Sequence, residues 1–483
     1  MKKSEKILEK YLVVCGKKTT FAHCKVFNMV HYLLTPPSLL RATVTLPASK
    51  SISNRALVIH ALSVQGKMQS AQGKSQSTQG DMQSGQGDMQ SPLPRNLSDC
   101  DDTEVIIRAL ETMPEVIDIK AAGTAMRFMT AFLAVTASPT AENVSPTGEG
   151  WRGLLTGTER MKHRPIKVLV DALRHLGADI SYAGEEGFPP LRISGRQLEG
   201  GLLEVAGNIS SQFISALLLI GPVLKHGLTL RLMGEIISRP YIDLTLWTMR
   251  EFGADAEWTA VDTIEVKPKP YEPRPYLIEN DWSAASYWYE MVALSRDPNA
   301  EIQLTGLMDG SKQGDSSVRY IFSLLGVRTT FQDATPGVPT TVTLRKSGQR
   351  VSRLDYDFTN APDLAQTIVC TCCALGVPFH FTGLQTLKIK ETDRIEALKT
   401  ELRKLGFILH DKNGRELSWD GTIDDYRLKA ASIDTYDDHR MALAFAPMSL
   451  LMSISINNPQ VVSKSYPHFW QDLTQAGFHI AES

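Results

Sequence analysis

The segment richest in residues that could do chemistry is Lys390-Glu391-Thr392-Asp393-Arg394. It precedes an expected amphipathic helix, in which the apolar residues recur at spacings of three and four: Ile395, Leu398, Leu402 and Leu405. Lys390 and Arg394 are four residues apart, so on a helical turn they share one face, with Glu391 beside them. A solvated helix start would explain this segment taken alone. Two cations and a carboxylate there also suit an anion-binding site with an acid/base group inside it.

Three segments of the first half repeat this chemistry. In the first, the segment 42–46 is predicted to be a strand, and a helix is expected from Ala56 onward. The turn between them carries Lys50, Ser51 and Arg55, which can bind phosphate or carboxylate oxygens. The second is the small Gly-containing loop 121–127, where Gly123 allows close backbone approach to a ligand and Arg127 follows. The third is the basic segment 156–165, where Pro165 holds Arg164 extended.

Other segments place hydroxyls or cations at expected helix starts. Ser210, Ser211 and Gln212 open an apolar helix, either as caps or as phosphate ligands at its positive end. A second set of hydroxyls comes from Ser238 and Tyr241. A further apolar helix is opened by His439 and Arg440, and the last cation of the series is Lys464.

Taken in order, these motifs resemble the 3-phosphoshikimate 1-carboxyvinyltransferases, also called 5-enolpyruvylshikimate-3-phosphate (EPSP) synthases, of the enolpyruvyl transferase family. The resemblance runs from about Leu40 to Phe478. It implies transfer of the enolpyruvyl group of phosphoenolpyruvate to the 5-hydroxyl of shikimate 3-phosphate, with release of phosphate, on the way to chorismate and the aromatic amino acids. It implies no cofactor and no metal, since Arg and Lys side chains supply the positive charge.

The resemblance also implies a role for each motif residue. Catalysis falls to Lys50, Asp363, Glu391 and His439, with Asp363 expected to act on the hydroxyl and Glu391 on the methylene proton. Shikimate 3-phosphate is expected to contact Lys50, Ser51, Arg55, Ser210, Ser211, Gln212, Ser238, Tyr241, Asp363, Thr386 and Lys390. Phosphoenolpyruvate is expected to contact Lys50, Gly123, Arg127, Arg164, Gln212, Arg394, Arg440 and Lys464.

Three positions depart from the family pattern. Ala121 and Thr386 stand where the family often has Asn, and Phe128 stands where it often has Pro. The first change removes a polar contact near phosphoenolpyruvate and the second puts a shikimate contact in question, but none of the three removes a charge that the reaction needs.

Three alternatives remain open from sequence. A UDP-N-acetylglucosamine enolpyruvyl transferase would carry a Cys in the segment 156–165, which has none. A nucleotide kinase is suggested only superficially by the segment 306–312, whose spacing is wrong for a phosphate-binding loop. A non-catalytic anion-binding paralogue would have lost Lys50, Asp363 or Glu391, and all three are present.

The composition of the chain argues against several other classes of protein. The 483 residues carry a net charge of −2, so no long-range field attracts nucleic acid or an anionic membrane surface. No apolar run reaches the ~18 residues of a membrane span. Three of the six cysteines, Cys370, Cys372 and Cys373, lie in an apolar helical run and are predicted to be reduced core residues. We expect a cytoplasmic enzyme, a monomer by resemblance, whose partners are its two small substrates.

The organisation of the chain follows from a repeat of roughly 70 residues. Helical patterns end in an apolar residue plus Gly at Gly177, Gly253, Gly326, Gly406 and Gly477, and an earlier degenerate copy ends near Met113-Pro114. The resemblance implies an α/β fold of two similar domains, each of three βαβαββ units in an inside-out barrel, with two chain crossovers between them. Because cations from both halves would repel each other across an empty cleft, we expect the domains to rest open and to close when anionic substrates bind. The expected first domain comprises 29–47 and 280–483, and the second comprises 48–279.

Two segments are expected to lie outside this repeat. The basic N-terminus, 1–28, is predicted to be a disordered extension or to precede the true start at Met29. The insert 65–91 repeats Gln-Gly every seven residues without a regular apolar position, which argues against a coiled coil and predicts disorder.

Overall fold

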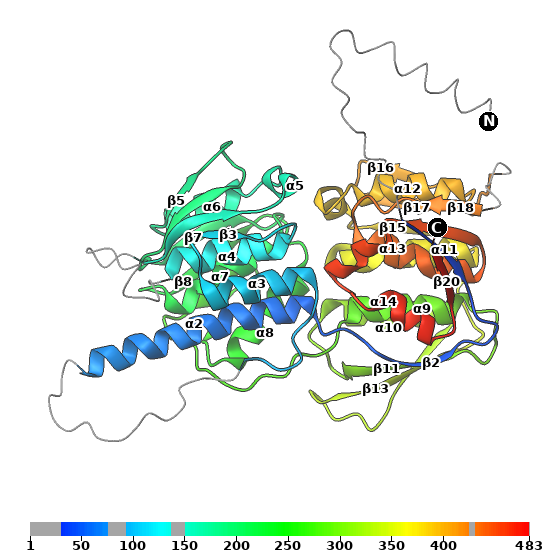
Figure 1. Ribbon diagram of the computed structural model, residues 1–483, viewed down its shortest axis with the longest axis horizontal. Helices are drawn as coiled ribbons and strands as arrows, with labels where there is room; N and C mark the ends of the chain where they lie inside the picture. The colour runs from blue at the N-terminus through cyan, green and yellow to red at the C-terminus, as the bar shows by residue number, and fades with distance from the viewer. Residues whose placement is uncertain (1–29, 76–92, 137–149, 425–429, 483) are drawn as a thin grey trace, which may run out of the picture.

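The computed structural model describes residues 30–75, 93–136, 150–424 and 430–482, with side chains of 66–75 excepted. Figure 1 shows two lobes side by side. We call the described residues between 48 and 278 the first lobe, and the described residues of 30–47 and 279–482 the second lobe; the sheets and helices below are those of these described residues. The buried apolar side chains form two separate clusters, and the chain passes from one to the other between Leu46 and Ala48 and between Ile278 and Trp282. Each lobe therefore has a core of its own.

The first lobe contains two four-stranded sheets. Their strand orders are β3-β4-β6-β5 and β7-β8-β10-β9. The strands are β3 (Val116–Asp118), β4 (Arg152–Thr156), β5 (Asp179–Tyr182), β6 (Leu191–Ser194), β7 (Gly201–Ala206), β8 (Leu228–Met233), β9 (Ala256–Trp258) and β10 (Thr263–Val266). In both sheets a parallel pair is followed by two antiparallel pairings.

The second lobe contains three sheets with the same pattern of pairings. Their orders are β2-β11-β13-β12, β14-β15-β17-β16 and β18-β19-β1-β20. The strands are β1 (His31–Thr35), β2 (Arg41–Thr45), β11 (Glu301–Met308), β12 (Val327–Phe331), β13 (Pro339–Lys346), β14 (Leu354–Asp357), β15 (Phe379–Thr382), β16 (His410–Lys412), β17 (Glu416–Trp419), β18 (Ala430–Ile433), β19 (Ser453–Asn457) and β20 (His479–Glu482).

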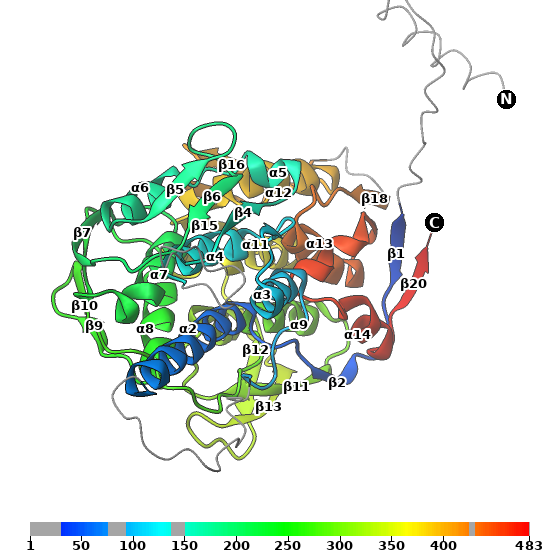
Figure 2. The ribbon, with the colours of Figure 1, turned by 60° about the vertical axis from the view of Figure 1, so that its left-hand side comes forward.

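The N-terminal strands complete sheets that the rest of the chain leaves unfinished. β1 lies antiparallel between β19 and β20, in the place that β17 takes between β15 and β16. Figure 2 shows β1 and β20 side by side. β2 pairs in parallel with β11, although the whole first lobe separates them in the chain. The chain thus crosses between the lobes twice, and the two crossings pair with each other at Ala48 and Asn280.

Many residues of the pocket described in the next subsection lie at the starts of helices. In the first lobe they are α2 (Lys50–Ser75), α3 (Asp101–Thr112), α4 (Gly123–Val135), α5 (Glu159–Lys162), α6 (Lys167–His175), α7 (Ser211–Ile220) and α8 (Arg239–Glu251). In the second they are α9 (Trp282–Leu294), α10 (Val318–Leu324), α11 (Ala365–Leu375), α12 (Arg394–Lys404), α13 (His439–Phe445) and α14 (Phe469–Gln475). The short 3₁₀ helices that matter below are η2 (Gly314–Ser317), η4 (Pro362–Leu364) and η5 (Gln385–Ile389).

Helices that are apolar on every face lie at the centre of each lobe. Nearly all residues of α4, α7, α9, α11 and α13 are buried, as expected for helices without a polar face. Strands such as β7 alternate buried and exposed residues, which is the pattern of a sheet with one face in the core. Cys370, Cys372 and Cys373 are buried, free thiols within α11, which confirms the prediction of a reduced core.

The predicted glycine turns are confirmed. All five glycines have φ between 82° and 99°, and each lies two residues after the end of a helix. This left-handed conformation is the one that favours glycine at a helix terminus. The degenerate copy ends at Met113, which adopts a φ of 40° as the C-cap of α3.

The low-complexity insert differs from the expectation in its first part. α2 continues through Ser75, so 65–75 is helical rather than disordered. Extending a helix that is already nucleated costs less than starting one, and Gln, Met, Ala and Lys in this stretch are good helix formers. Residues 76–91 and the extension 1–28 lie outside the described residues. No helix in the described part of the chain has the length and apolar character that a membrane crossing needs.

Candidate active site

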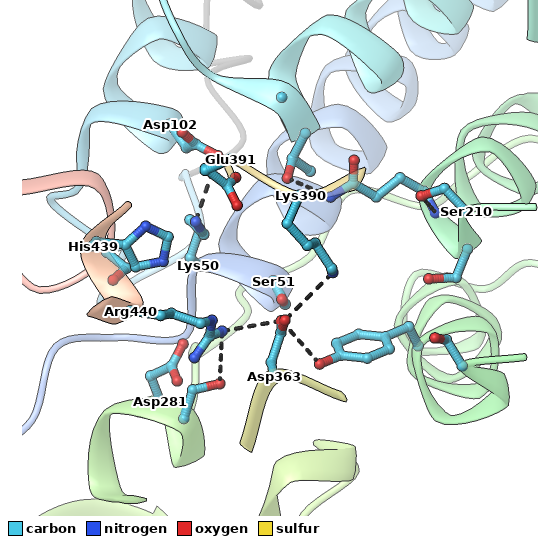
Figure 3. A pocket seen from close by; sticks show the side chains of 18 of the residues that line it. Lys50, Ser51, Asp102, Ser210, Asp281, Asp363, Lys390, Glu391, His439 and Arg440 are labelled. Carbon is cyan, nitrogen blue, oxygen red and sulfur yellow. Dashed lines mark hydrogen bonds and ion pairs between the residues drawn. The ribbon is translucent and has the colours of Figure 1, made fainter. Parts of the chain in front are cut away.

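A pocket between the lobes collects most of the predicted site residues. Sixteen of the nineteen line it: Lys50, Ser51, Arg55, Gly123, Arg164, Ser210, Ser211, Gln212, Ser238, Tyr241, Asp363, Lys390, Glu391, Arg394, His439 and Arg440. Figure 3 shows side chains of both lobes pointing into the same space. Segments that are up to 390 residues apart in the chain therefore meet at one place.

Six helices begin at this pocket. The first residues of α2, α4, α7, α12 and α13 line it, and so does Ser238, the N-cap of α8. The N-terminus of a helix carries partial positive charge and unpaired backbone N–H groups. The convergence of several such ends, added to the cationic side chains, makes the pocket suited to anions.

Asp363 is the most heavily paired carboxylate of the pocket. Its oxygens lie 3.0 Å from Arg440, 3.3 Å from Arg394 and 3.4 Å from Lys390, and they accept a hydrogen bond of 3.2 Å from the Tyr241 hydroxyl. Burial alone would raise the pKa of Asp363, but these cations hold it well below its ordinary value. Asp363 is therefore ionised at neutral pH.

Glu391 lies on the other side of Arg394. Its carboxylate is 2.9 Å from the guanidinium of Arg394 and 3.9 Å from that of Arg164 in the first lobe. Burial would raise the pKa of Glu391, but Arg394, Arg164 and other cations lower it well below its usual range. The pKa values of Asp363 and Glu391 are therefore both lowered. Two carboxyls of which one acts as an acid and the other as a base would be expected to have different surroundings.

Arg394 is the structural centre of this group. Only 1% of its side chain is exposed, and it forms a bidentate pair of 2.7 and 3.1 Å with the fully buried Asp438. Asp438 also caps α13 by accepting a bond from the backbone N–H of Arg440. Arg394 therefore ties α12 to α13 while it reaches both pocket carboxylates.

Lys50 is the cation at the seam between the lobes. Its Nζ lies 3.6 Å from Asp102 and donates to the backbone oxygen of Lys464 at 3.3 Å. Burial lowers the pKa of Lys50, but the negative charges of Asp102 and Glu391 more than offset this and raise it. His439 is buried among cations, and burial together with Lys50 and Arg440 holds its pKa well below 6.5, so its ring is neutral.

The first lobe also contributes polar side chains to the pocket, and these differ in the hydrogen bonds that they form within the lobe. Arg55 donates to Thr245, Ser215 and the backbone oxygens of Ser51 and Tyr241, so its guanidinium is largely satisfied inside the lobe. Burial lowers the pKa of Arg55 to about 10. Gln212 donates to Thr124 at 3.2 Å, and the Ser210 hydroxyl accepts the N–H of Gln212 as the N-cap of α7. Ser210 therefore caps the helix and also faces the pocket.

Three predicted residues do not line this pocket. Arg127 is buried behind Gly123, to whose oxygen it donates, and burial followed by the charge of Arg164 lowers its pKa to about 9. Thr386 lies in η5 with a buried hydroxyl that has no partner. Lys464 donates its Nζ to the backbone oxygen of Asp437 and lines a neighbouring hollow. The backbone oxygen of Lys464 accepts a hydrogen bond from Lys50 of the pocket.

Sequence reasoning missed several residues that line the pocket, namely Asp102, Thr124, Asp281, Ser283, Ala284, Tyr287 and Ser465. Asp281 and Ser283 directly follow the predicted crossover near Asn280, so the position of the crossover was the signal that could have found them. Asp102 is in the first turn of α3 and needed the fold to bring it to Lys50.

The charges in the pocket wall nearly balance. Six Lys and Arg side chains and four carboxylates line it, which leaves an excess of two positive charges with His439 neutral. This excess suits small polyanions. No cluster of three or more His, Cys, Asp or Glu with metal-site geometry occurs among the residues that the structure describes.

Gly123 gives a test of how closely the pocket is packed. A Cβ on Gly123 would lie 2.5 Å from a guanidinium nitrogen of Arg164, which must therefore move. We expect Gly123→Ala to raise KM for an anionic substrate bound by Arg164 by about tenfold or more, with little loss of stability, because Ala favours the helix. Steady-state kinetics would measure this. Gly184→Ala, whose Cβ meets only Pro190 at 3.7 Å, is the control. An unchanged KM would show that Arg164 does not bind the anionic substrate.

Comparison with known proteins shows the family of this chain. The family model of EPSP synthase (3-phosphoshikimate 1-carboxyvinyltransferase) matches residues 34–473. A 3-phosphoshikimate 1-carboxyvinyltransferase of Bacteroides fragilis is 55% identical over 452 residues, covering 93% of this chain and 99% of the relative. A protein of the same name from Shewanella pealeana is 33% identical over 444 residues, covering 91% and 98%.

Solved structures define the class of fold. The EPSP synthase of Acinetobacter baumannii has a TM-score of 0.69 at 18% identity, covering 94% of this chain and all of that one. The enolpyruvyl transferase NikO from Streptomyces tendae has a TM-score of 0.60 at 12% identity, covering 94% and 99%. The fold is therefore the mixed α/β fold of these transferases. The family match and the close relatives show that the chain belongs to the EPSP synthase family, which confirms the predicted family and its transferase activity.

Proposed function

We propose that this chain transfers the enolpyruvyl group of phosphoenolpyruvate to the 5-hydroxyl of shikimate 3-phosphate and releases phosphate. The observation that carries this proposal is the pocket itself, where six helix starts, six cations and two paired carboxylates from both lobes converge. Two phosphorylated, carboxylate-bearing substrates need such a density of donors to lie side by side.

We infer that the lobes are two domains that close over the substrates, each built of βαβαββ units around central helices as an inside-out barrel. The separate cores support the division. Contacts across the seam support closure: the backbone N–H of Ser238 donates to Thr359 at 3.1 Å, Ser463 donates to Asp101 at 2.8 Å, and Tyr241 reaches Asp363. Closure would exclude water from the reacting atoms.

The positions of the side chains suggest a division of the substrates. Ser210, Ser211, Ser238 and Tyr241 lie on the first-lobe side, where their hydroxyls and the starts of α7 and α8 suit the phosphate of shikimate 3-phosphate. Lys50, Arg164 and Arg394 lower the pKa of Glu391 by their charge, and these cations, together with Arg440 beside Asp363, suit phosphoenolpyruvate. Asp363 and Lys390 lie next to Tyr241, where the 5-hydroxyl would be placed.

The reaction needs a base for the hydroxyl and an acid for the methylene carbon. Asp363 is ionised and is suited to the first role. Glu391 is held ionised by Arg394 and Arg164, so it needs a change of surroundings to act as the acid. Phosphoenolpyruvate supplies this change, because its negative charges compete for the same cations and raise the pKa of Glu391. Lys50 then stabilises charge on the departing phosphate.

A coupled assay of phosphate release tests the proposal. We expect release only when phosphoenolpyruvate and shikimate 3-phosphate are both present. UDP-N-acetylglucosamine in place of shikimate 3-phosphate should give none, because the pocket offers no cysteine among its lining residues for the sibling reaction. Binding of both substrates without phosphate release would instead indicate a non-catalytic paralogue. We also propose a cytoplasmic location, which the free state of the four described cysteines supports.

A further inference from the structure

A second carboxyl lies directly behind Asp363. Asp315, in η2, is 4% exposed and does not line the pocket. The hydroxyl of Tyr241 stands between the two carboxyls, 3.2 Å from an oxygen of Asp363 and 3.4 Å from an oxygen of Asp315. A phenol can donate one hydrogen bond and accept another, so Tyr241 can connect the two groups.

The two carboxyls have opposite surroundings. Asp363 contacts three cations, Arg440, Arg394 and Lys390. The Asp315 oxygens instead accept hydrogen bonds from the neutral hydroxyls of Ser283 and Tyr241. The first setting favours a carboxylate, and the second tolerates a neutral acid.

The groups that face Asp315 come from several elements. Burial raises the pKa of Asp315 to about 6; the charges of Asp363 and Asp281 raise it, while Arg440 and the Ser283 hydrogen bond lower it. Tyr356 of β14 also interacts with Asp315, and Tyr241 of α8 completes its surroundings. At neutral pH, Asp315 is therefore mostly ionised and yet accepts a proton far more readily than Asp363 does.

We propose that Asp315 stores the proton that leaves the 5-hydroxyl, and that Tyr241 relays it from Asp363. This inference rests on the proposed function. The O–H bond of the hydroxyl breaks as its oxygen bonds to the central carbon of phosphoenolpyruvate, and the proton passes to Asp363. Asp363 then donates it to the Tyr241 oxygen while Tyr241 passes its own hydrogen to Asp315. The relay changes no other bond and no oxidation state, and the proton goes to solvent after the products leave.

The relay restores Asp363 before the second half of the reaction. A protonated Asp363 would leave Arg440 and Lys390 without their carboxylate partner. Moving the proton to Asp315 returns the negative charge to the site with three cations, which is the favourable direction. Asp315 does not line the pocket, so it acts on the reaction through Tyr241 and Asp363.

The test compares Asp315→Asn with the full-length wild-type enzyme over pH 5 to 9. We expect kcat of the variant to fall about 10- to 100-fold, because a proton acceptor is lost. In the wild type, kcat should decline as the pH falls through about 6, since protonated Asp315 can accept nothing. This acidic limb should be absent from the variant. A kcat within about twofold of wild type, or a lowered kcat that keeps the limb, would overturn the relay.

Further variants separate the relay from a structural role. Tyr241→Phe keeps both carboxyls but breaks the connection, so it should lose the same limb, and the double variant should be no slower than the slower single variant. Multiplying losses would contradict the relay. Asp315→Glu keeps a carboxyl and should keep the decline of kcat at acidic pH. This variant tests the relay if Asp315→Asn fails to fold. The exposed Asp355→Asn is the matched control. Phosphate release by the wild type tests the proposed function separately.

Discussion

Replacing Glu391 with glutamine should lower kcat by about 10²- to 10⁴-fold, because glutamine cannot deliver or take up a proton. Binding of shikimate 3-phosphate should change little. Glu391 contacts Arg394 and Arg164, on the side of the pocket that we assign to phosphoenolpyruvate. Single-turnover kinetics would measure the loss in the chemical step, and titration calorimetry would measure binding of shikimate 3-phosphate.

The control for this variant lies on the same helix. Glu396→Gln removes an exposed carboxylate that pairs with Lys399 at 2.7 Å and does not line the pocket. Its turnover should match that of the wild type. Turnover of Glu391→Gln within about threefold of wild type would refute the role of Glu391 as a proton donor. Loss of shikimate 3-phosphate binding would instead place Glu391 on the other substrate.

Replacing Arg394 with methionine should destabilise the second lobe by about 3–5 kcal/mol. The substitution leaves Asp438, which is fully buried, without the bidentate partner at 2.7 and 3.1 Å. At about 2–4 °C per kcal/mol for a domain of this size, the melting temperature should fall by roughly 10 °C. Differential scanning calorimetry would show the shift in the transition of the second lobe.

Two comparisons sharpen this result. Arg403→Met, at the exposed end of α12, removes the same charge from the same helix and should cost about 1 kcal/mol or less. The double variant Arg394→Met with Asp438→Asn should recover part of the lost stability, because the unpaired buried charge is gone. If Arg394→Met melts with the wild type, Asp438 has found another cation and the ion pair is not what joins α12 to α13.

Local patterns in the sequence gave the correct framework. The glycine turns at Gly177, Gly253, Gly326, Gly406 and Gly477 were predictable because a helix terminus that needs a positive φ selects glycine locally. The helix starts that carry Ser211 and His439 were likewise predictable, since apolar periodicity begins next to each. The start of α2 was predicted too late, because the helix begins at Lys50 and not at Ala56. The ordered motifs identified the family, because their combination is far more specific than any one of them.

The partners of each charged side chain could not be predicted in this way. Arg55 donates hydrogen bonds to Thr245 and Ser215. Arg127 lies behind the pocket wall and donates to the Gly123 oxygen, and Lys464 donates to the backbone oxygen of Asp437. A cation in a motif can face a ligand or an acceptor within the protein, and for Arg55 the side-chain acceptors lie 160 and 190 residues away in the chain. The helical continuation of α2 through Ser75 was missed for a related reason, since a helix nucleated elsewhere can extend into a segment with no apolar pattern.

By itself, the sequence determined which chemistry this protein carries, because residue types and short spacings are local properties. It also determined the repeat of helices, strands and glycine turns. Only the tertiary structure decided which acids face which cations: that Asp102 pairs with Lys50, and that Asp315 lies behind Asp363 at the hydroxyl of Tyr241. The reason is physical. The charge state of a carboxyl depends on its burial and on the cations around it, and chain folding brings those cations together from distant segments.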